Sequence, residues 1–248
     1  MLKVRVIPIL TFNGFGLVKT KQFQNPRMVG NPIQTAKVYN SRGVDELIFL
    51  DIFATRQKRK INLKLVGEVI KECYMPVAIG GGIESIKDIN DLLKIGADKV
   101  VIKTKALTDP AFIEEAVYFF GSQCITIAVD VVKKDGSYQI HNDLGIKVDL
   151  DTFLKNMEAL KVGEFVVNSV DRDGMMHGFD QELINQVSAK TSIPIIAVGG
   201  GGEIEHYSTL FNETNVGAVG SASIFHFTQH TPHDIKLVLA RNNFPVRL

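Results

Sequence analysis

The chain has 248 residues, of which 45% are hydrophobic, and a formal net charge of +1. This length suits one large α/β domain with a sizeable core, and the near-neutral charge argues against nucleic acid or an acidic membrane surface as a partner. The two cysteines, Cys73 and Cys124, form no disulfide framework, and the charged N-terminal run is neither a signal peptide nor a membrane span, so we expect a cytoplasmic protein.

Short β-branched runs alternate along the chain with amphipathic stretches that have helical spacing. The predicted strands, in chain order, are 4–10, 46–52, 76–79, 99–102, 125–130, 165–170, 194–198 and 217–220. Amphipathic helices are predicted at 62–73, 86–95, 110–120 and 150–160. Eight strand-then-helix units in series predict parallel strands with right-handed crossovers, and therefore a single (β/α)₈ TIM barrel over residues 1–248. A doubly wound sheet is the alternative.

Two glycine-rich turns follow predicted strands at equivalent places in the chain. They begin at Gly80 and Gly199, 119 residues apart. This repeat predicts two half-barrels, approximately 1–120 and 121–248, and favours a closed barrel over an open sheet. Glycine lets the backbone approach a phosphate closely, and the free amides of the next helix attract the anion. The sequence therefore predicts a phosphate-binding end in each half.

The chemistry of such a barrel takes place at the C-terminal ends of its strands. The first phosphate-binding end is predicted at Gly81, Gly82, Lys103 and Thr104. The second is predicted at Asp173, Gly174, Gly200, Ala222 and Ser223. The alternative is that these glycines serve only tight strand-to-helix turns. No nucleotide-binding loop or complete set of metal ligands is evident, so we expect neither a cofactor nor a metal.

Several segments together resemble the HisF family, the cyclase subunits of imidazole glycerol phosphate synthase. They are residues 5–8, 16–19, 45–51, 96–99, 120–123, 171–174 and 223–227. The resemblance implies a barrel that receives ammonia from a HisH-like glutaminase subunit docked at its bottom face. It also implies that the ammonia attacks a substrate with a phosphate at each end, giving imidazole glycerol phosphate and an aminoimidazole carboxamide ribotide.

The resemblance also implies two carboxylates over the substrate, at the ends of the first and fifth strands. Asp130 occupies the fifth-strand position, but Thr11 stands at the first. A hydroxyl does not exchange protons near neutral pH as a carboxylate does, so one half of the acid–base pair is missing. Lys19, on the loop after the first strand, matches the family, so the predicted catalytic residues are Asp130, Lys19 and Thr11. Lys103 replaces a small amide side chain, although a lysine can still bind phosphate.

Four charged residues begin the first, second, fourth and sixth strands and match the ring that gates ammonia entry in the HisF family. They are Arg5, Glu46, Lys99 and Glu164. Two cations and two anions can pair, which offsets the cost of burying them. A purely structural layer of salt bridges is the alternative. The resemblance also implies that Asp98 and Gln123 lie at the glutaminase-docking face.

Three hypotheses for the function follow. The loss of the first carboxylate favours a HisF-like subunit of a glutamine amidotransferase that aminates a sugar or nucleotide sugar in surface-polysaccharide biosynthesis, if needed with a third, sugar-amidating enzyme. HisF-like paralogues of such gene clusters also lack that carboxylate. The alternative is the ring-closing cyclase of histidine biosynthesis, with Asp130 and Lys19 or another group in catalysis. The third hypothesis, a non-enzymatic scaffold, disagrees with the retained gate charges.

Overall fold

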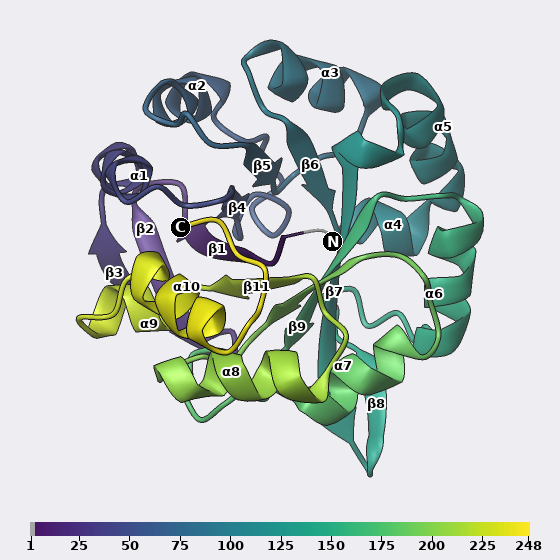
Figure 1. The fold of residues 1–248 in the computed structure, drawn as a ribbon. Helices are drawn as coiled ribbons and strands as arrows, with labels where there is room; N and C mark the ends of the chain where they lie inside the picture. The colour runs from purple at the N-terminus through teal and green to yellow at the C-terminus, as the bar shows by residue number, and fades with distance from the viewer. Residues whose placement is uncertain (1–2) are drawn as a thin grey trace.

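Eight parallel strands close into a barrel in the computed structural model, which describes residues 3–248 (Figure 1). They are β1 (Arg5–Phe12), β4 (Leu47–Asp51), β5 (Val77–Gly80), β6 (Lys99–Ile102), β7 (Ile125–Lys134), β9 (Glu164–Ser169), β10 (Ile195–Val198) and β11 (Ala218–Ser221). The barrel closes because β11 pairs in parallel with β1, with Arg5 opposite Ala218 and Pro8 opposite Ser221. The predicted (β/α)₈ barrel is confirmed, and each predicted strand lies within two residues of an observed one at either end, except that β7 ends four residues later than predicted.

Helices follow every barrel strand and surround the sheet (Figure 1). The longer ones are α1 (Pro32–Ser41), α2 (Leu63–Lys71), α3 (Ile86–Lys94), α5 (Pro110–Phe120), α6 (Leu150–Ala159), α7 (Gln181–Ser188), α8 (Ile204–Glu213) and α10 (Pro232–Arg241). Two short helices, α4 (Thr104–Thr108) and α9 (Ser223–Phe227), precede α5 and α10, and a 3₁₀ turn (Ser122–Cys124) precedes β7. The short helices start 119 residues apart, which fits the predicted two-fold repeat. None of the helices within residues 3–248 is both long enough and apolar enough to cross a membrane.

Capping side chains define where several helices begin. Asp109 accepts a hydrogen bond from the backbone amide of Phe112 at the start of α5. Thr231, the N-cap residue of α10, and Asp234, three residues later, form a capping box at the start of this helix. Such caps satisfy backbone amides that have no partner inside the helix. They fix the point at which the chain leaves the barrel and turns back along it.

Two hairpin extensions were not predicted from the sequence. β2 (Leu17–Lys21) and β3 (Gln24–Gly30) form an antiparallel hairpin after β1, and β8 (Ser137–Ile140) pairs back onto β7. The side chains of β3 are mostly exposed, so its sequence lacks the alternation of apolar and polar residues that identifies a strand. The β2–β3 hairpin supplies several residues to the top of the barrel.

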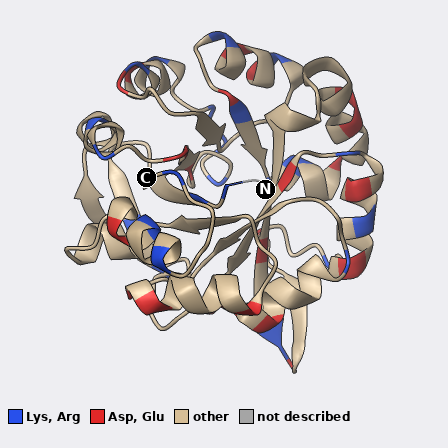
Figure 2. Ribbon diagram, viewed as in Figure 1, with Lys and Arg blue, Asp and Glu red and all other residues tan. Residues whose placement is uncertain are grey.

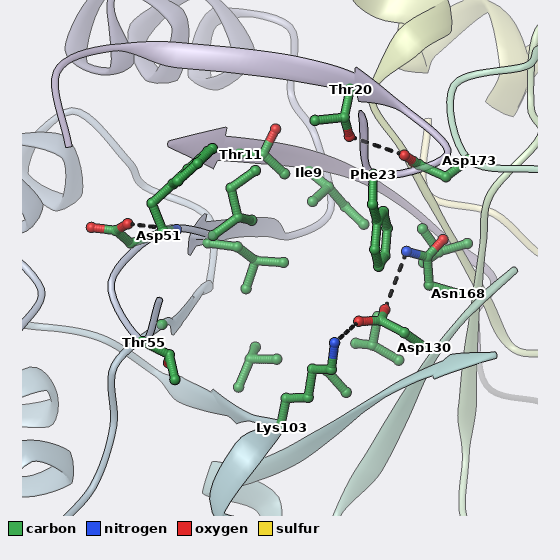
Figure 3. Close-up of a pocket in the computed structure, with 18 of the residues that line it drawn as sticks. Ile9, Thr11, Thr20, Phe23, Asp51, Thr55, Lys103, Asp130, Asn168 and Asp173 are labelled. Atoms are coloured by element: carbon green, nitrogen blue, oxygen red, sulfur yellow. Dashed lines mark hydrogen bonds and ion pairs between the residues drawn. The ribbon is translucent and has the colours of Figure 1, made fainter. Parts of the chain in front are cut away.

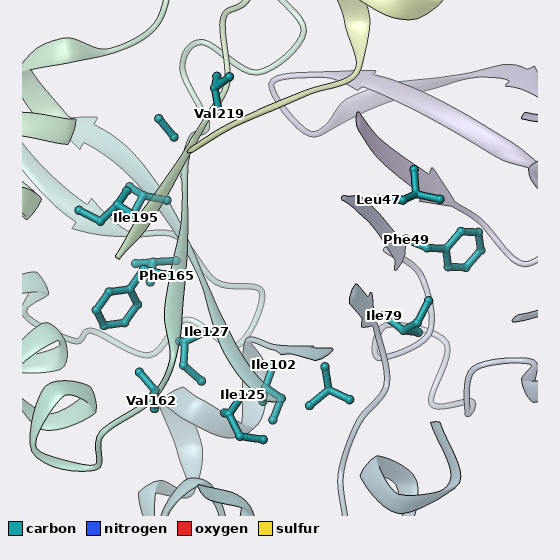
Figure 4. Packing of buried hydrophobic residues seen from close by; sticks show 14 of the residues in the cluster. Leu47, Phe49, Ile79, Ile102, Ile125, Ile127, Val162, Phe165, Ile195 and Val219 are labelled. Atoms are coloured by element: carbon teal, nitrogen blue, oxygen red, sulfur yellow. The ribbon is translucent and has the colours of Figure 1, made fainter. Parts of the chain in front are cut away.

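Period-two alternation gives the barrel two cores. The larger core lies between strands and helices and includes Leu47, Phe49 and Phe165 (Figure 4). The smaller one fills the barrel axis and includes Ile7, Ile9, Ile48, Ala78, Val101, Val166, Ile196 and Ala218. Residues on the axial face therefore connect the bottom of the barrel with the top.

Candidate active site

A cavity of about 740 Å³ lies at the C-terminal end of the barrel (Figure 3). Its walls come from all eight barrel strands or from the turns directly after them, and from the β2–β3 hairpin. Every residue that was predicted for catalysis or phosphate binding lines it: Thr11, Lys19, Gly81, Gly82, Lys103, Thr104, Asp130, Asp173, Gly174, Gly200, Ala222 and Ser223. The fold thus brings this set together, while the role of each residue stays a prediction.

Asp130 lies between a cation and an amide on the cavity wall (Figure 3). Its carboxylate forms an ion pair with the ammonium group of Lys103, and the side-chain nitrogen of Asn168 donates to the other oxygen at 3.3 Å. Lys103 also lies 5.7 Å from the ring centroid of Phe23, which comes from the β2–β3 hairpin. Lys103 therefore contacts the carboxylate directly, a role that the phosphate prediction did not include.

Thr11 faces the cavity from β1, but its hydroxyl already has a partner. It donates to the backbone oxygen of Val18 on β2 and so ties the hairpin to the barrel. Thr11 and Asp130 are 119 residues apart, as are the glycine-rich turns, so they occupy equivalent positions in the two halves. One half thus presents a carboxylate where the other presents a hydroxyl.

Lys19 also has a partner in this structure. Its ammonium nitrogen lies 2.5 Å from a carboxylate oxygen of Asp173, and both side chains are buried. Thr20 donates to the other oxygen of the same carboxylate at 3.1 Å. Gly174 has a φ of +71°, and a Cβ there would lie only 2.3 Å from the backbone oxygen of Thr20. Asp173 and Gly174 therefore anchor the hairpin at the edge of the cavity.

The glycines at both predicted phosphate-binding ends are required by close backbone packing. A Cβ at Gly81 would lie 2.2 Å from the backbone oxygen of Asp51, and one at Gly200 would lie 2.0 Å from that of Gly178. Both glycines have a φ of +110°, a conformation that L side chains rarely adopt. Tight packing alone thus accounts for these two positions, so they do not by themselves identify a ligand.

Ser223 gives a separate indication at the second end. Its hydroxyl oxygen is buried, lines the cavity and has no hydrogen-bond partner within residues 3–248. A buried polar group without a partner is costly unless a ligand or water satisfies it. Sequence reasoning selected Ser223, but it missed Asn168, whose amide oxygen is also buried and unpartnered. No pattern in the chain marks Asn168, because its significance depends on its contact with Asp130.

The four predicted gate residues form a closed ring of ion pairs at the bottom of the barrel. Glu46 lies 2.6 Å from Arg5 and 2.8 Å from Lys99. Glu164 lies 3.1 Å from Lys99 and also pairs with Arg5. Burial opposes the charge of Arg5, but the hydrogen bonds and charges of the two glutamates outweigh it and raise the pKa of Arg5. Most other charged residues lie on the helices and loops (Figure 2), so this ring is unusual for the strands.

Aromatic side chains are exposed on the same bottom face. Asp98 and Gln123, the predicted docking residues, are both exposed, and Asp98 accepts from the backbone amide of Val77 at 2.8 Å. Tyr118 and Phe119, at the end of α5, are 83% and 59% exposed. Exposed aromatic residues beside polar ones are typical of protein interfaces. Sequence reasoning alone did not single out these two residues for docking.

The sequence of this chain is similar to those of several known proteins. The chain matches the family model described as "Histidine biosynthesis protein" over residues 5–231. It is 40% identical to the imidazole glycerol phosphate synthase subunit HisF of Dehalococcoides mccartyi, over all of this chain and 99% of that protein. It is 38% identical to the HisF subunit of Clostridium botulinum over the whole of both chains. It is also 40% identical to the HisF subunit of Endomicrobium trichonymphae, over all of this chain and 96% of that one.

Proposed function

We propose that this chain is the synthase subunit of a glutamine amidotransferase of the imidazole glycerol phosphate synthase type. The premise is that the chain belongs to the histidine biosynthesis protein family and, within it, to the HisF family. A HisH-like glutaminase would release ammonia at the bottom face, and the ammonia would react in the cavity. The names of the relatives favour ring closure for histidine biosynthesis over the sugar amination that the sequence analysis preferred.

The alignment of the charged ring with the cavity carries this proposal. Lys99, Val101 and Lys103 lie on the same axial face of β6 and the residue after it, and Val101 and Lys103 line the cavity. A single apolar layer therefore separates the ring from the cavity floor. Uncharged ammonia crosses such a layer at a far lower desolvation cost than a charged ion does. A ring of balanced charges below an apolar layer is suited to admit ammonia and to hold back ions.

The cavity offers groups for the proton transfers that amination requires. When ammonia attacks a carbonyl carbon, the new nitrogen loses protons and the carbonyl oxygen gains them before it leaves as water. In this proposal the carboxylate of Asp130 accepts a proton from nitrogen, and the ammonium group of Lys103 supplies one to oxygen. The unpartnered hydroxyl of Ser223 would accept or donate a hydrogen bond at the substrate's phosphate. The exposed aromatic side chains at the end of α5, a few residues before Gln123 in the sequence, support a docked glutaminase.

A second candidate function is amination of another phosphorylated acceptor, such as a sugar. Two observations favour it. Thr11 offers a hydroxyl that is already bonded to Val18, and Lys103 adds a cation beside Asp130. With a hydroxyl in place of a carboxylate and a lysine in place of a small amide, the site is more positively charged than the HisF pattern implies. A third, sugar-amidating enzyme would belong to this version of the proposal.

The experiment that separates the two candidates compares this chain with the D. mccartyi HisF subunit under identical conditions. Each is mixed with a HisH glutaminase, glutamine and the ribulosyl substrate of the histidine pathway, and imidazole glycerol phosphate is measured by mass spectrometry. Slow but glutamine-dependent formation of this product supports ring closure. No product from this chain, together with glutamine hydrolysis that depends on it, supports the second candidate. If this chain yields no product and does not stimulate glutamine hydrolysis either, the proposal as a whole is contradicted.

A further inference from the structure

One buried hydroxyl inside the barrel has no partner and lies outside the predicted site. Thr126 on β7 is 1% exposed, and its hydroxyl oxygen makes no hydrogen bond within residues 3–248. Thr126 shares the axial face of its strand with Ala128 and Asp130, both of which line the cavity. Valine would fill nearly the same volume without leaving a polar atom unsatisfied, so the hydroxyl at this position calls for a ligand.

The pairing of the strands places Thr126 beside the charged ring. Across the sheet it is opposite Glu164 of β9 on one side and Val101 of β6 on the other. Glu164 is a member of the ring, and Val101 lines the cavity. The hydroxyl of Thr126 therefore lies between the charged ring and the floor of the cavity.

The rest of this layer is apolar. The axial cluster consists of isoleucine, valine and alanine side chains, with Leu50, Ala128 and Val198 packed against it. The two other buried side-chain oxygens that have no partner within residues 3–248, on Asn168 and Ser223, lie in the wall of the cavity itself. A small molecule that leaves the ring toward the cavity thus meets one hydrogen-bonding side chain on the way.

We infer that the hydroxyl of Thr126 is a binding point for one molecule of ammonia in transit between the ring and the cavity. The inference rests on the proposed function. The hydroxyl donates its O–H to the lone pair of ammonia, a lone pair that ammonium lacks. No covalent bond forms or breaks, and Thr126 acts only by positioning the molecule in a layer that offers no other partner.

The functional test uses the assembled complex with its glutaminase and acceptor. Thr126→Val should lower the product formed per glutamine hydrolysed by about three-fold or more, while product formation from added ammonium chloride stays unchanged because the cavity is reached from the top. Thr126→Ser, which keeps the hydroxyl, should restore the wild-type ratio. An unchanged ratio in Thr126→Val overturns the inference.

Thermal unfolding shows whether a lower ratio of product to hydrolysed glutamine results only from a less stable fold. Thr214 also has a buried hydroxyl, but that one donates to the backbone oxygen of Leu210 at 2.7 Å. Thr214→Val should therefore lower the melting temperature, whereas Thr126→Val should leave it unchanged or raise it, because no hydrogen bond is lost. If the melting temperature falls as much in Thr126→Val as in Thr214→Val, the hydroxyl of Thr126 has a partner within the protein, and the inference is overturned.

A direct test does not depend on enzyme activity. Crystals of the wild-type chain and of Thr126→Val are soaked in ammonium chloride at a pH where uncharged ammonia is abundant, and in sodium chloride as a control. Density at hydrogen-bond distance from the Thr126 hydroxyl, absent in Thr126→Val, supports a binding point, and neutron diffraction distinguishes ammonia from water by its number of hydrogens. An empty site, or water under both conditions, overturns the inference. If the wild-type complex forms no product from glutamine or from ammonium chloride, the proposed function fails. The crystal soak then decides by itself whether Thr126 binds ammonia.

Discussion

Lys103 and Asp130 form an ion pair on the cavity wall where the two halves of the barrel meet, because β6 of the first half pairs with β7 of the second. Lys103 immediately precedes α4, and the equivalent position before α9, 119 residues later, is Ala222. Thr11 is likewise the equivalent of Asp130. The first half therefore contributes a cation and a hydroxyl where the second contributes a methyl group and a carboxylate. The two halves of the barrel therefore place different charges on the cavity wall beside Asp130.

Thr11→Asp should raise ring-closing turnover with the histidine-pathway substrate. Losing one partner of an acid–base pair typically costs on the order of 10²–10⁴ in rate, so the wild-type chain should turn over far below the D. mccartyi subunit. The carboxylate of the variant would face Asp130 from the equivalent position and recover part of that loss. Steady-state rates with ammonium chloride measure the effect. Wild-type turnover at ordinary enzyme rates would show that Thr11 is no handicap.

Lys103→Asn should free the carboxylate of Asp130 from its ion pair and change which substrate is used. The rate of ring closure should also fall, by on the order of 10²–10⁴, because the proposed proton donor to the leaving oxygen is gone. Lys105 is a matched control, since it lies on α4 and pairs with Asp109 instead. Rates of ring closure and of sugar amination, measured for both variants, give the comparison. Identical rates for Lys103→Asn and Lys105→Asn would exclude a role for Lys103 in the reaction.

The barrel could be predicted from the sequence because most barrel strands carry a buried apolar run rich in β-branched residues, a local pattern that does not depend on distant contacts. The β2–β3 hairpin could not, because β3 is mostly exposed and the turn is built from Gln22 and Phe23 in left-handed conformations, with φ of +49° and +62°. The residues that line the cavity could be predicted because they lie at the ends of the strands. The ion pair between Lys103 and Asp130 could not, because it depends on the register of β6 against β7 and on the side-chain conformations.

Phosphate should stabilise the folded chain through the unpartnered hydroxyl of Ser223. A ligand that binds only the folded state at 100 times its Kd adds about 2.7 kcal/mol to the free energy of unfolding. Ser223→Ala should weaken this stabilisation, and Thr104→Val should do the same at the first end. Larger side chains at Gly200 are poor tests, because a Cβ there collides with the backbone of Gly178. Melting temperatures in phosphate and in chloride provide the measurement. An equal response of wild type and both variants would place phosphate elsewhere.

His226 should make the protein less stable at acidic pH. Burial, together with the charge of Lys19, lowers the pKa of His226 to about 4 from its ordinary 6.5. The unfolded chain therefore takes up a proton below about pH 6.5, whereas the folded chain takes one up only near pH 4. Stability from this group is complete above pH 6.5 and is lost as the pH falls toward 4, by about 2 kcal/mol between pH 7.5 and 5.

Urea unfolding at pH 7.5 and at pH 5 measures this contribution. The difference between the two pH values should be smaller in His226→Gln than in wild type, because glutamine does not titrate. His233→Gln serves as the control, since His233 is exposed. The carboxylates are common to all three proteins and drop out of the comparison. The same pH dependence in wild type and His226→Gln would show that this histidine does not control acid stability.

Glu164→Gln should separate the gating role of the charged ring from a structural one. The substitution keeps the size of the side chain but leaves Arg5 and Lys99 with one anion between them. Because both cations are about a quarter exposed, water compensates part of the loss, and we expect a stability cost of about 1–2 kcal/mol. Disturbing the entrance should reduce amination driven by glutamine, whereas amination driven by ammonium chloride, which enters from the top, should be largely preserved.

The control for Glu164→Gln is Asp91→Asn, which removes an exposed pair with Lys87 on α3, remote from the axis. It should leave both activities and the stability within experimental error of wild type. Amination from glutamine and from ammonium chloride is measured on the same assembled complex, at a temperature where every variant is folded. If Glu164→Gln lowers both activities equally, the ring supports the barrel and does not gate it. A selective loss with glutamine, while the rate of glutamine hydrolysis stays unchanged, supports a gating role of the ring, because docking, the cavity and the fold are then intact.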